Sequence, residues 1–126
     1  MIDTSALMAI VLNEPQAEAC MAAIEQEPEL AISAATLAEA LVVATRRGIG
    51  PAMDELVRDL AMETVPVTEA EARRVSAAYS RWGRGVHKAG LNFGDCFAYA
   101  LAKQRQWPLL FVGNDFARTD LQSALR

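Results

Sequence analysis

Short apolar runs alternate with longer segments of helical periodicity along this chain. The runs that suit buried strands end near Asp3 and cover residues 30–32, 62–67 and 109–112. Helices are predicted over residues 5–12, 13–27, 34–47, 51–61 and 69–82, from the turn that holds Asp95 to about residue 102, and from about Thr119 onward. Strands that alternate with helices are typical of an α/β domain with a mostly parallel sheet and right-handed crossovers. We expect a central sheet of four to five short strands.

Residues with a preference for helix ends mark where some of these helices begin. Asn13, followed by Glu14 and Pro15, is typical of an N-cap with an acidic first turn. Thr68 with Glu71 three residues later matches a capping box. Apart from that role, Glu71 groups with the solvated acids that lie among other polar positions.

Composition fits one folded domain, which we expect to span residues 1–126. The chain is 52% hydrophobic and 22% charged, so it resembles globular rather than disordered proteins. No apolar run approaches the roughly 18 residues of a membrane span, and the start lacks the basic region and cleavage site of a signal peptide. Cys20 and Cys96 lie far apart in apolar helical pattern, which predicts buried thiols in a reducing compartment, the cytoplasm.

Two acidic residues are isolated inside apolar helical segments. Asp95 is the only charge from residue 89 to 102 and falls in the first turn of a helix, where the helix dipole alone would favour an acid. Glu39 is the only charge from residue 30 to 45. A lone buried carboxylate is costly unless it is paired or metal-bound, and a buried ion pair with an Arg or an exposed helix edge would also explain Glu39.

Two further acids follow predicted strands. Asp3 comes at the end of the first strand and Asp115 after the run at residues 109–112, and the carboxyl ends of parallel strands are where sites gather in such sheets. Each has a structural alternative, because Asp3 is placed to cap the next helix and Asp115 competes with Asn114 for a similar role. With Glu39 and Asp95 they make four carboxylates that an α/β sheet would bring to one cleft.

Such a cluster predicts a site for a hard divalent cation. Four carboxylates without a neutralising Lys repel one another and persist most easily around Mg²⁺ or Mn²⁺, as one ion or two. Zinc does not fit, since His87 is the only histidine and no cysteines are paired. Two ions about 3.5 to 4 Å apart would activate a water and stabilise the leaving oxygen in phosphodiester cleavage.

Four segments together resemble one known family. IDTSAL at the start, SAATLAEAL, HKAGLNFGDCFAYALAK and LLFVGNDFARTDL, in this order and spacing, resemble the PIN-domain ribonucleases, specifically the VapC toxins of bacterial toxin–antitoxin pairs. The resemblance covers essentially the whole chain. It implies a three-layer α/β/α fold and a Mg²⁺- or Mn²⁺-dependent endoribonuclease. It also implies a VapB-like antitoxin that holds the enzyme inactive, and a homodimer.

The resemblance also implies roles for individual residues. The catalytic and metal-binding acids of the family fall on Asp3, Glu39, Asp95 and Asp115. Thr4 and Ser5 match the polar residues that orient the first acid or a metal-bound water. Supporting positions behind the acids fall on Asn114, where family members vary, and on Asp120. The first strand is about a residue shorter than is usual in the family.

A cluster of basic residues is the predicted grip on RNA phosphates. It consists of Arg81, Arg84, His87, Lys88 and Arg118. The net charge of −4 argues against a surface that is basic everywhere, and a solvated surface is the plain alternative for this cluster. Arg46 and Arg47 fall at a helix end away from the acids and suit a partner surface better.

Two other functions fit the same residues. A binding module would use the acids to receive a basic partner segment, since an Arg fork pairs well with carboxylates, and it would cut nothing. A nuclease acting on flap or single-stranded DNA would share the metal chemistry. The RNA target is left open, because transfer, ribosomal and messenger RNA present similar phosphates to such a cleft.

Overall fold

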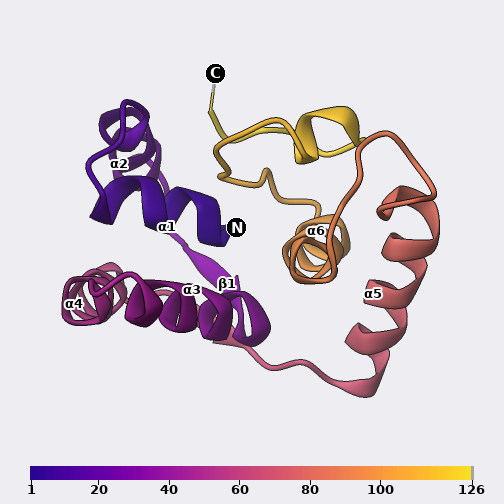
Figure 1. The fold of residues 1–126 in the computed structure, drawn as a ribbon, viewed down its shortest axis with the longest axis horizontal. Coiled ribbons are helices and arrows are strands. Elements are labelled where there is room, and N and C mark those ends of the chain that lie inside the picture. The colour runs from indigo at the N-terminus through magenta and orange to yellow at the C-terminus, as the bar shows by residue number, and fades with distance from the viewer. Residues whose placement is uncertain (126) are drawn as a thin grey trace.

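The computed structural model of the chain describes residues 1–125. The helices in this part are α1 (Thr4–Val11), α2 (Ala17–Glu25), α3 (Ala34–Arg46), α4 (Gly50–Leu60), α5 (Glu69–Trp82) and α6 (Phe93–Arg105). Two short strands, β1 (Ala31–Ser33) and β2 (Glu63–Val65), and a 3-10 helix, η1 (Phe116–Arg118), complete the regular elements described. In Figure 1, α1 to α4 gather on the left and α5 with α6 on the right, with β1 between them.

The sheet is larger than its two regular strands. β1 and β2 pair in parallel, with Ile32 opposite Thr64. Residues 1–3 lie beside β1, because the Ile2 N–H donates to the Ala31 carbonyl oxygen at 3.1 Å. The start of the chain therefore lies in the middle of the sheet.

Two extended segments from the C-terminal part continue the sheet on the other side. Residues 109–111 pair in parallel with residues 1–3 through the bridge from Ile2 to Leu110, and residues 122–124 follow through the parallel bridge from Leu109 to Ser123. The order across the sheet is β2, β1, residues 1–3, residues 109–111 and residues 122–124. This confirms the predicted sheet of four to five short strands.

Apolar side chains of the sheet alternate between two hydrophobic cores. Met1, Ala31 and Leu109 belong to the core formed with α5 and α6. Their neighbours Ile2 and Ile32 belong to the core formed with α1 to α4. Successive side chains of a strand point to opposite faces, so helices cover both faces of the sheet. The predicted three-layer α/β/α architecture is confirmed.

Two of the predictions about helices are wrong. Asn13 has φ 51° and turns the chain at the end of α1, so it ends that helix instead of starting the next, and α2 begins at Ala17 after Gln16. Asn is among the few residues that tolerate this left-handed conformation. The helix predicted from about Thr119 is absent from the described residues: η1 ends at Arg118, Thr119 is extended, and residues 122–124 lie beside the sheet.

Glu71 is not solvated, and its capping box is half formed. Thr68 accepts a hydrogen bond from the Glu71 N–H at 3.2 Å, so the predicted cap is present. The Glu71 carboxylate turns instead to Arg74, 2.9 Å away, and the residue is 4% exposed. The ion pair within one turn of α5 takes the carboxylate away from the helix start.

The predictions for the cysteines hold in the described part. Cys20 and Cys96 are both free and buried. Among residues 1–125, the helices are too short or too polar to cross a membrane.

Candidate active site

Asp3 ends the first extended segment and caps the helix that follows at once. It is 4% exposed, and its Oδ2 accepts hydrogen bonds from the Ser5 N–H at 3.0 Å and the Ser5 hydroxyl at 2.6 Å. The Ser5 Oγ in turn accepts from the Val112 N–H at 3.0 Å. Ser5 therefore fixes Asp3 and joins it to the carboxyl end of residues 109–111.

Glu39 reaches the same region from the middle of α3. Its Oε1 lies 2.8 Å from the Thr4 hydroxyl oxygen, which also lies 3.1 Å from the Thr36 carbonyl oxygen. No Arg, Lys or His within residues 1–125 forms an ion pair with Glu39. A buried ion pair therefore does not explain Glu39. The Thr4 hydroxyl contacts Glu39, whereas the Thr4 backbone acts on Asp3.

Gly94 was not among the predicted site residues, yet it makes room for Glu39. A Cβ at Gly94 would lie 2.5 Å from Glu39 Oε2. The Glu39 carboxylate therefore rests against the first turn of α6, where N–H groups lack helical partners and favour negative charge. A glycine inside a helix costs stability, so its presence in the first turn was the available signal.

Asp95 lies in that same first turn and is fixed by a reciprocal pair of bonds with Asn92. The Asn92 Oδ1 accepts from the Asp95 N–H at 2.8 Å, and Asp95 Oδ2 accepts from the Asn92 N–H at 3.0 Å. This capping box explains why α6 begins at Phe93. It engages Oδ2 of Asp95, as Ser5 engages Oδ2 of Asp3.

The charges of the four predicted acids act on one another. Burial, and after it the negative charges of Asp3, Asp115 and Glu39, raise the pKa of Asp95 to about 6 against the opposing effect of the Asn92 N–H. The pKa of Asp3 is also raised, mainly by burial and in part by Glu39, although the Ser5 bonds oppose this. The fold thus brings four acids into one electrostatic field.

Asp115 lies in the loop after residues 109–111, and its charge acts on Asp95. It stands at the N-cap position of η1, but its side chain makes no capping hydrogen bond there. Both Asp115 and the preceding Asn114 are exposed. Because capping does not occupy Asp115, its carboxylate is available to a ligand in the cleft.

The donor set suits a hard divalent cation held partly through water. Within residues 1–125, no three Asp, Glu, His or Cys side chains converge closely enough to surround an ion as direct ligands. Mg²⁺ commonly keeps several waters and uses only one or two carboxylates of the protein. Four mutually repelling carboxylates without a paired base therefore fit Mg²⁺ or Mn²⁺, and their oxygens do not suit zinc.

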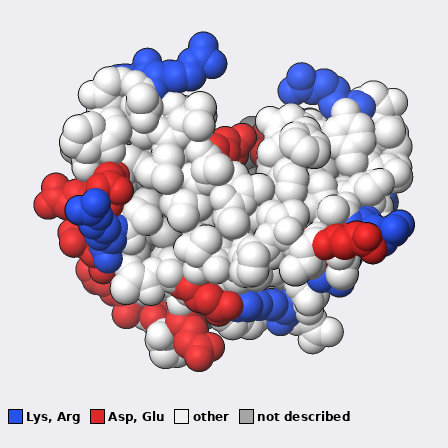
Figure 2. Space-filling view, turned by 90° about the horizontal axis from the view of Figure 1, so that it is seen from below, with Lys and Arg blue, Asp and Glu red and all other residues white. Residues whose placement is uncertain are grey.

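The cleft is visible on the molecular surface. Figure 2 shows acidic atoms at the bottom of a notch in the outline, and Lys and Arg atoms on the prominences to both sides of it. Glu39 of α3 lies against the first turn of α6, which holds Asp95, so these acids lie where α3 meets α6. An acidic floor between basic rims suits a polyanion that meets a cation.

The basic residues predicted to bind RNA differ in how free they are. Arg84 and Lys88 are exposed in the loop before α6, and the Arg118 guanidinium donates to the Lys88 carbonyl oxygen at 3.1 Å. His87 is half-buried, its ring meets Trp82 edge-to-face at a centroid distance of 4.7 Å, and its Nδ1 accepts from the Ala89 N–H at 2.9 Å. The imidazole therefore supports the loop, whereas the exposed cations are open to phosphates.

Comparison with known proteins gives the family. A model of the PIN domain matches residues 1–121. Ribonuclease VapC28 of Mycobacterium tuberculosis is 45% identical over 128 residues, which cover 98% of this chain and 96% of that protein. The chain belongs to the VapC ribonucleases of the PIN domain family. The family predicted from the sequence is confirmed.

Solved structures share the PIN fold. Mycobacterium tuberculosis VapC20, described as a Sarcin-Ricin loop cleaving toxin, matches with a TM-score of 0.77 at 16% identity, over 95% of this chain and 94% of that one. A toxin–antitoxin complex from Klebsiella pneumoniae matches with a TM-score of 0.68 at 19% identity, over 94% and 91% of the two chains. At these identities the likeness shows the fold alone.

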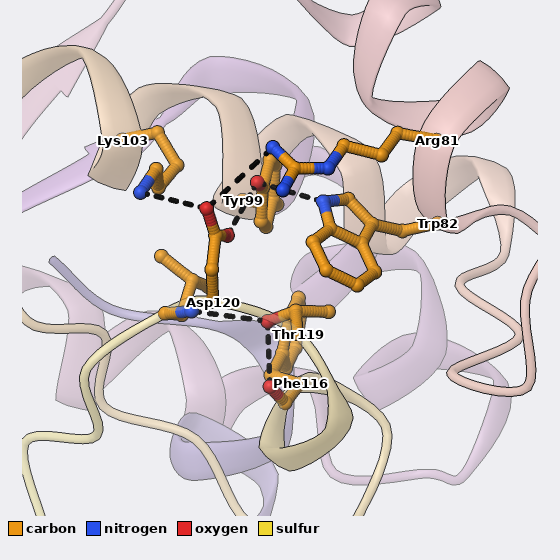
Figure 3. A network of polar contacts seen from close by, with 8 residues as sticks. Arg81, Trp82, Tyr99, Lys103, Phe116, Thr119 and Asp120 are labelled. Carbon is orange, nitrogen blue, oxygen red and sulfur yellow. Dashed lines mark hydrogen bonds and ion pairs between the residues drawn. The ribbon is translucent and has the colours of Figure 1, made fainter.

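In this VapC-family chain, Asp120 belongs to a network beside the acids rather than to the acid cluster itself. The Tyr99 hydroxyl donates to Asp120 at 2.6 Å and accepts from the Trp82 indole N–H at 2.8 Å. Lys103 and Arg81 lie 3.1 Å and 3.7 Å from the Asp120 carboxylate. Figure 3 shows these side chains converging from α5, α6 and the loop after η1.

The same network occupies Arg81, one of the predicted RNA-binding residues. Its guanidinium lies 4.5 Å from the centre of the Trp82 ring and faces Asp120. Arg81 is thus tied to the packing of α5 on α6, which leaves it less free than Arg84 or Lys88. The network fastens the loop after η1, and with it Asp115, to α6.

We expect Tyr99→Phe to lower the free energy of unfolding of this domain by about 1 to 3 kcal/mol, because the buried Trp82 N–H loses its acceptor. Burial and the bond to Asp120 raise the pKa of Tyr99 to about 12, so its hydroxyl stays protonated and donating at neutral pH. Urea unfolding would measure the loss. Tyr79→Phe, at a residue that is 39% exposed, is the control and should change stability by less than about 0.5 kcal/mol. Equal effects would contradict the role of the network.

Proposed function

We propose that this chain is a Mg²⁺- or Mn²⁺-dependent endoribonuclease that hydrolyses RNA phosphodiester bonds in the cleft between α3 and α6. One observation carries the proposal: Glu39 lies against the helix turn that holds Asp95, Asp3 and Asp115 are near enough for their charges to act on Asp95, and no Lys, Arg or His of residues 1–125 forms an ion pair with any of these acids. Membership of the VapC ribonucleases supports RNA as the substrate. The site would take one ion or two.

The hydrogen bonds of each acid indicate its role at the cation. Asp3 and Asp95 would hold the cation, because each is oriented through its Oδ2 by hydrogen bonds from its own segment. Glu39 and Asp115 would bind or orient water beside it. A bound ion would supply activation of the attacking water and stabilisation of the leaving oxygen.

The exposed cations would hold the substrate. Arg84 and Lys88 lie in the loop that leads into α6, and the bond from Arg118 to the Lys88 carbonyl brings η1 to the same loop. Phosphates bound by these residues would lie beside the acids. Such contacts position nucleic acid without reading its sequence.

The toxin role belongs to this proposal as well. A VapB-like antitoxin would hold the enzyme inactive in the cytoplasm, and a second copy of the chain would form a homodimer. The Klebsiella pneumoniae complex, which has the same fold, supports an antitoxin partner. Exposed apolar residues such as Val42, which is 58% exposed, offer surface for such contacts.

The test is cleavage of single-stranded RNA by the purified chain without antitoxin. Cleavage should need Mg²⁺ or Mn²⁺ and stop with EDTA, and calorimetry should show Mn²⁺ uptake that Asp3→Ala removes. RNA and single-stranded DNA of one sequence would be compared side by side. Faster cutting of DNA would favour the flap-type nuclease, and no specific Mn²⁺ uptake together with no cleavage would favour a binding module.

A further inference from the structure

The side chain of Phe93 is exposed at the edge of the acidic cleft. It is 69% exposed, more than any other large hydrophobic residue in residues 1–125. Burying a Phe side chain contributes about 1.5 to 3 kcal/mol, so an exposed one forgoes that stabilisation in the free protein. A single exposed apolar residue is ordinary by itself. The residues around Phe93 are what indicate a ligand for it.

The Phe93 ring is held in place although it is exposed. It meets the ring of Phe97 one turn later at a centroid distance of 5.0 Å and an angle of 85°, an edge-to-face contact. Phe97 itself is half-buried and packs against the core of α5 and α6. The backbone at Phe93 is fixed by the capping box between Asn92 and Asp95. One ring face is thus presented by a rigid helix end.

The same helical turn carries the proposed chemistry. Gly94, the next residue, contacts the Glu39 carboxylate, and Asp95 follows directly. Lys88 lies in the loop just before this turn and is exposed. A strand of RNA whose phosphate lies at the acids therefore has an aromatic face on one side and cations along the loop.

We propose that Phe93 stacks on an unpaired base beside the scissile phosphate and so positions RNA in the cleft. The proposal rests on the nuclease function proposed above and adds the kind of nucleotide that the site takes. Single-strand-binding proteins combine a cationic track with aromatic side chains in this way, and stacking tolerates every base because each has a π-face. The position beside the cut therefore requires an unpaired base and is tolerant of its identity.

Kinetics of three variants test the role. Phe93→Ala should raise KM for single-stranded RNA about 5- to 100-fold, the range expected for loss of one stacked base, with a smaller effect on kcat. Phe93→Trp should restore the wild-type KM, because it restores a stacking face. Val67→Ala is the control, since Val67 is 39% exposed in the segment between β2 and α5, and it should leave KM unchanged.

A binding experiment separates stacking from other roles. A single-stranded RNA that carries 2-aminopurine, mixed with Asp95→Asn protein so that no cleavage occurs, should lose fluorescence on binding, and the added Phe93→Ala change should prevent this. RNA cut readily by the wild type but protected when the same sequence is annealed into a duplex would support the proposal too.

Several results would overturn it. If Phe93→Ala keeps the wild-type KM while Asp95→Asn is inactive, the stacking role fails and the nuclease function stands. If Phe93→Ala changes the oligomeric state measured by sedimentation but leaves KM unchanged, Phe93 is a protein contact and the proposal fails. If the wild type cuts no RNA with Mg²⁺ or Mn²⁺, the proposed function fails first, and the stacking role fails with it.

Discussion

Replacing Asp95 with asparagine should abolish RNA cleavage and at the same time stabilise the cation-free protein at neutral pH. Asn keeps an oxygen that can accept the Asn92 N–H, so the cap of α6 is retained. It removes the negative charge that would hold the cation. Loss of a residue that only hydrogen-bonds to a metal ligand typically lowers activity by up to about 100-fold. Loss of Asp95 itself should lower it by more.

The gain in stability follows from the sign of the pKa change. The pKa of Asp95 rises from the ordinary 3.8 to about 6 in the folded protein, so the fold disfavours its charged form. Between these values the folded state binds more protons than the unfolded state, and stability falls as pH rises. The rise corresponds to roughly 3 kcal/mol, which partial exposure to solvent reduces to about 1 to 2 kcal/mol.

Urea unfolding in EDTA at pH 5 and pH 7.5 would measure this effect. The wild type should be less stable at pH 7.5 than at pH 5 as far as this group is concerned, and Asp95→Asn should reduce the difference. Asp54→Asn is the control, because Asp54 pairs with Arg58 on α4 and should gain nothing. An Asp95→Asn protein that is less stable than the wild type at pH 7.5 would contradict the account of repelling acids.

Gly94→Ala should separate activity from folding. The added Cβ would lie 2.5 Å from Glu39 Oε2, the end of a flexible side chain that can turn away at little cost. Ala also favours a helix by about 1 kcal/mol over Gly, so the free energy of unfolding should stay equal or rise. Cleavage should fall at least about tenfold, in the range found when groups that position metal ligands are lost.

Gly50→Ala is the matched control for this substitution. Gly50 also lies in the first turn of a helix, α4, and an added Cβ there would approach Thr45 Oγ1 at 3.3 Å without meeting any acid. It should leave cleavage unchanged. If Gly94→Ala cleaves RNA as well as Gly50→Ala does, the contact between Glu39 and the first turn of α6 has no part in the reaction.

Local patterns predicted the fold because a strand that is covered by helices on both faces must be apolar at successive positions, which can be read from the sequence. The run at residues 109–112 is apolar at successive positions, and Leu109 and Leu110 indeed enter opposite cores. Boundaries were less predictable where one residue type serves two purposes. Asn13 is favourable both before a helix and in the left-handed turn after one, and only the packing of α1 and α2 decides between them.

In the candidate site too, the sequence identifies individual residues but not the contacts between them. An isolated charge in an apolar segment was enough to single out Glu39 and Asp95. The close approach of Glu39 to Gly94 depends on how α3 packs against α6, which no local pattern contains. Asp120 was predicted to support the acids, and its contacts with Tyr99 and Lys103 arise where α5, α6 and the loop after η1 meet, which no local pattern contains.

The central place of residues 1–3 in the sheet has a consequence for the folding of the enzyme during its synthesis. The Asp3 N–H donates to the Leu110 carbonyl oxygen, and the Val112 N–H donates to Ser5, so the first acid is held by residues made more than a hundred positions later. Contacts so distant in sequence form late, because closing a long loop precedes any gain. A growing or truncated chain that lacks residues 109–115 would have neither the support for Asp3 nor Asp115. On the proposed mechanism, the site for the cation can therefore form only after residues 109–115 have been made.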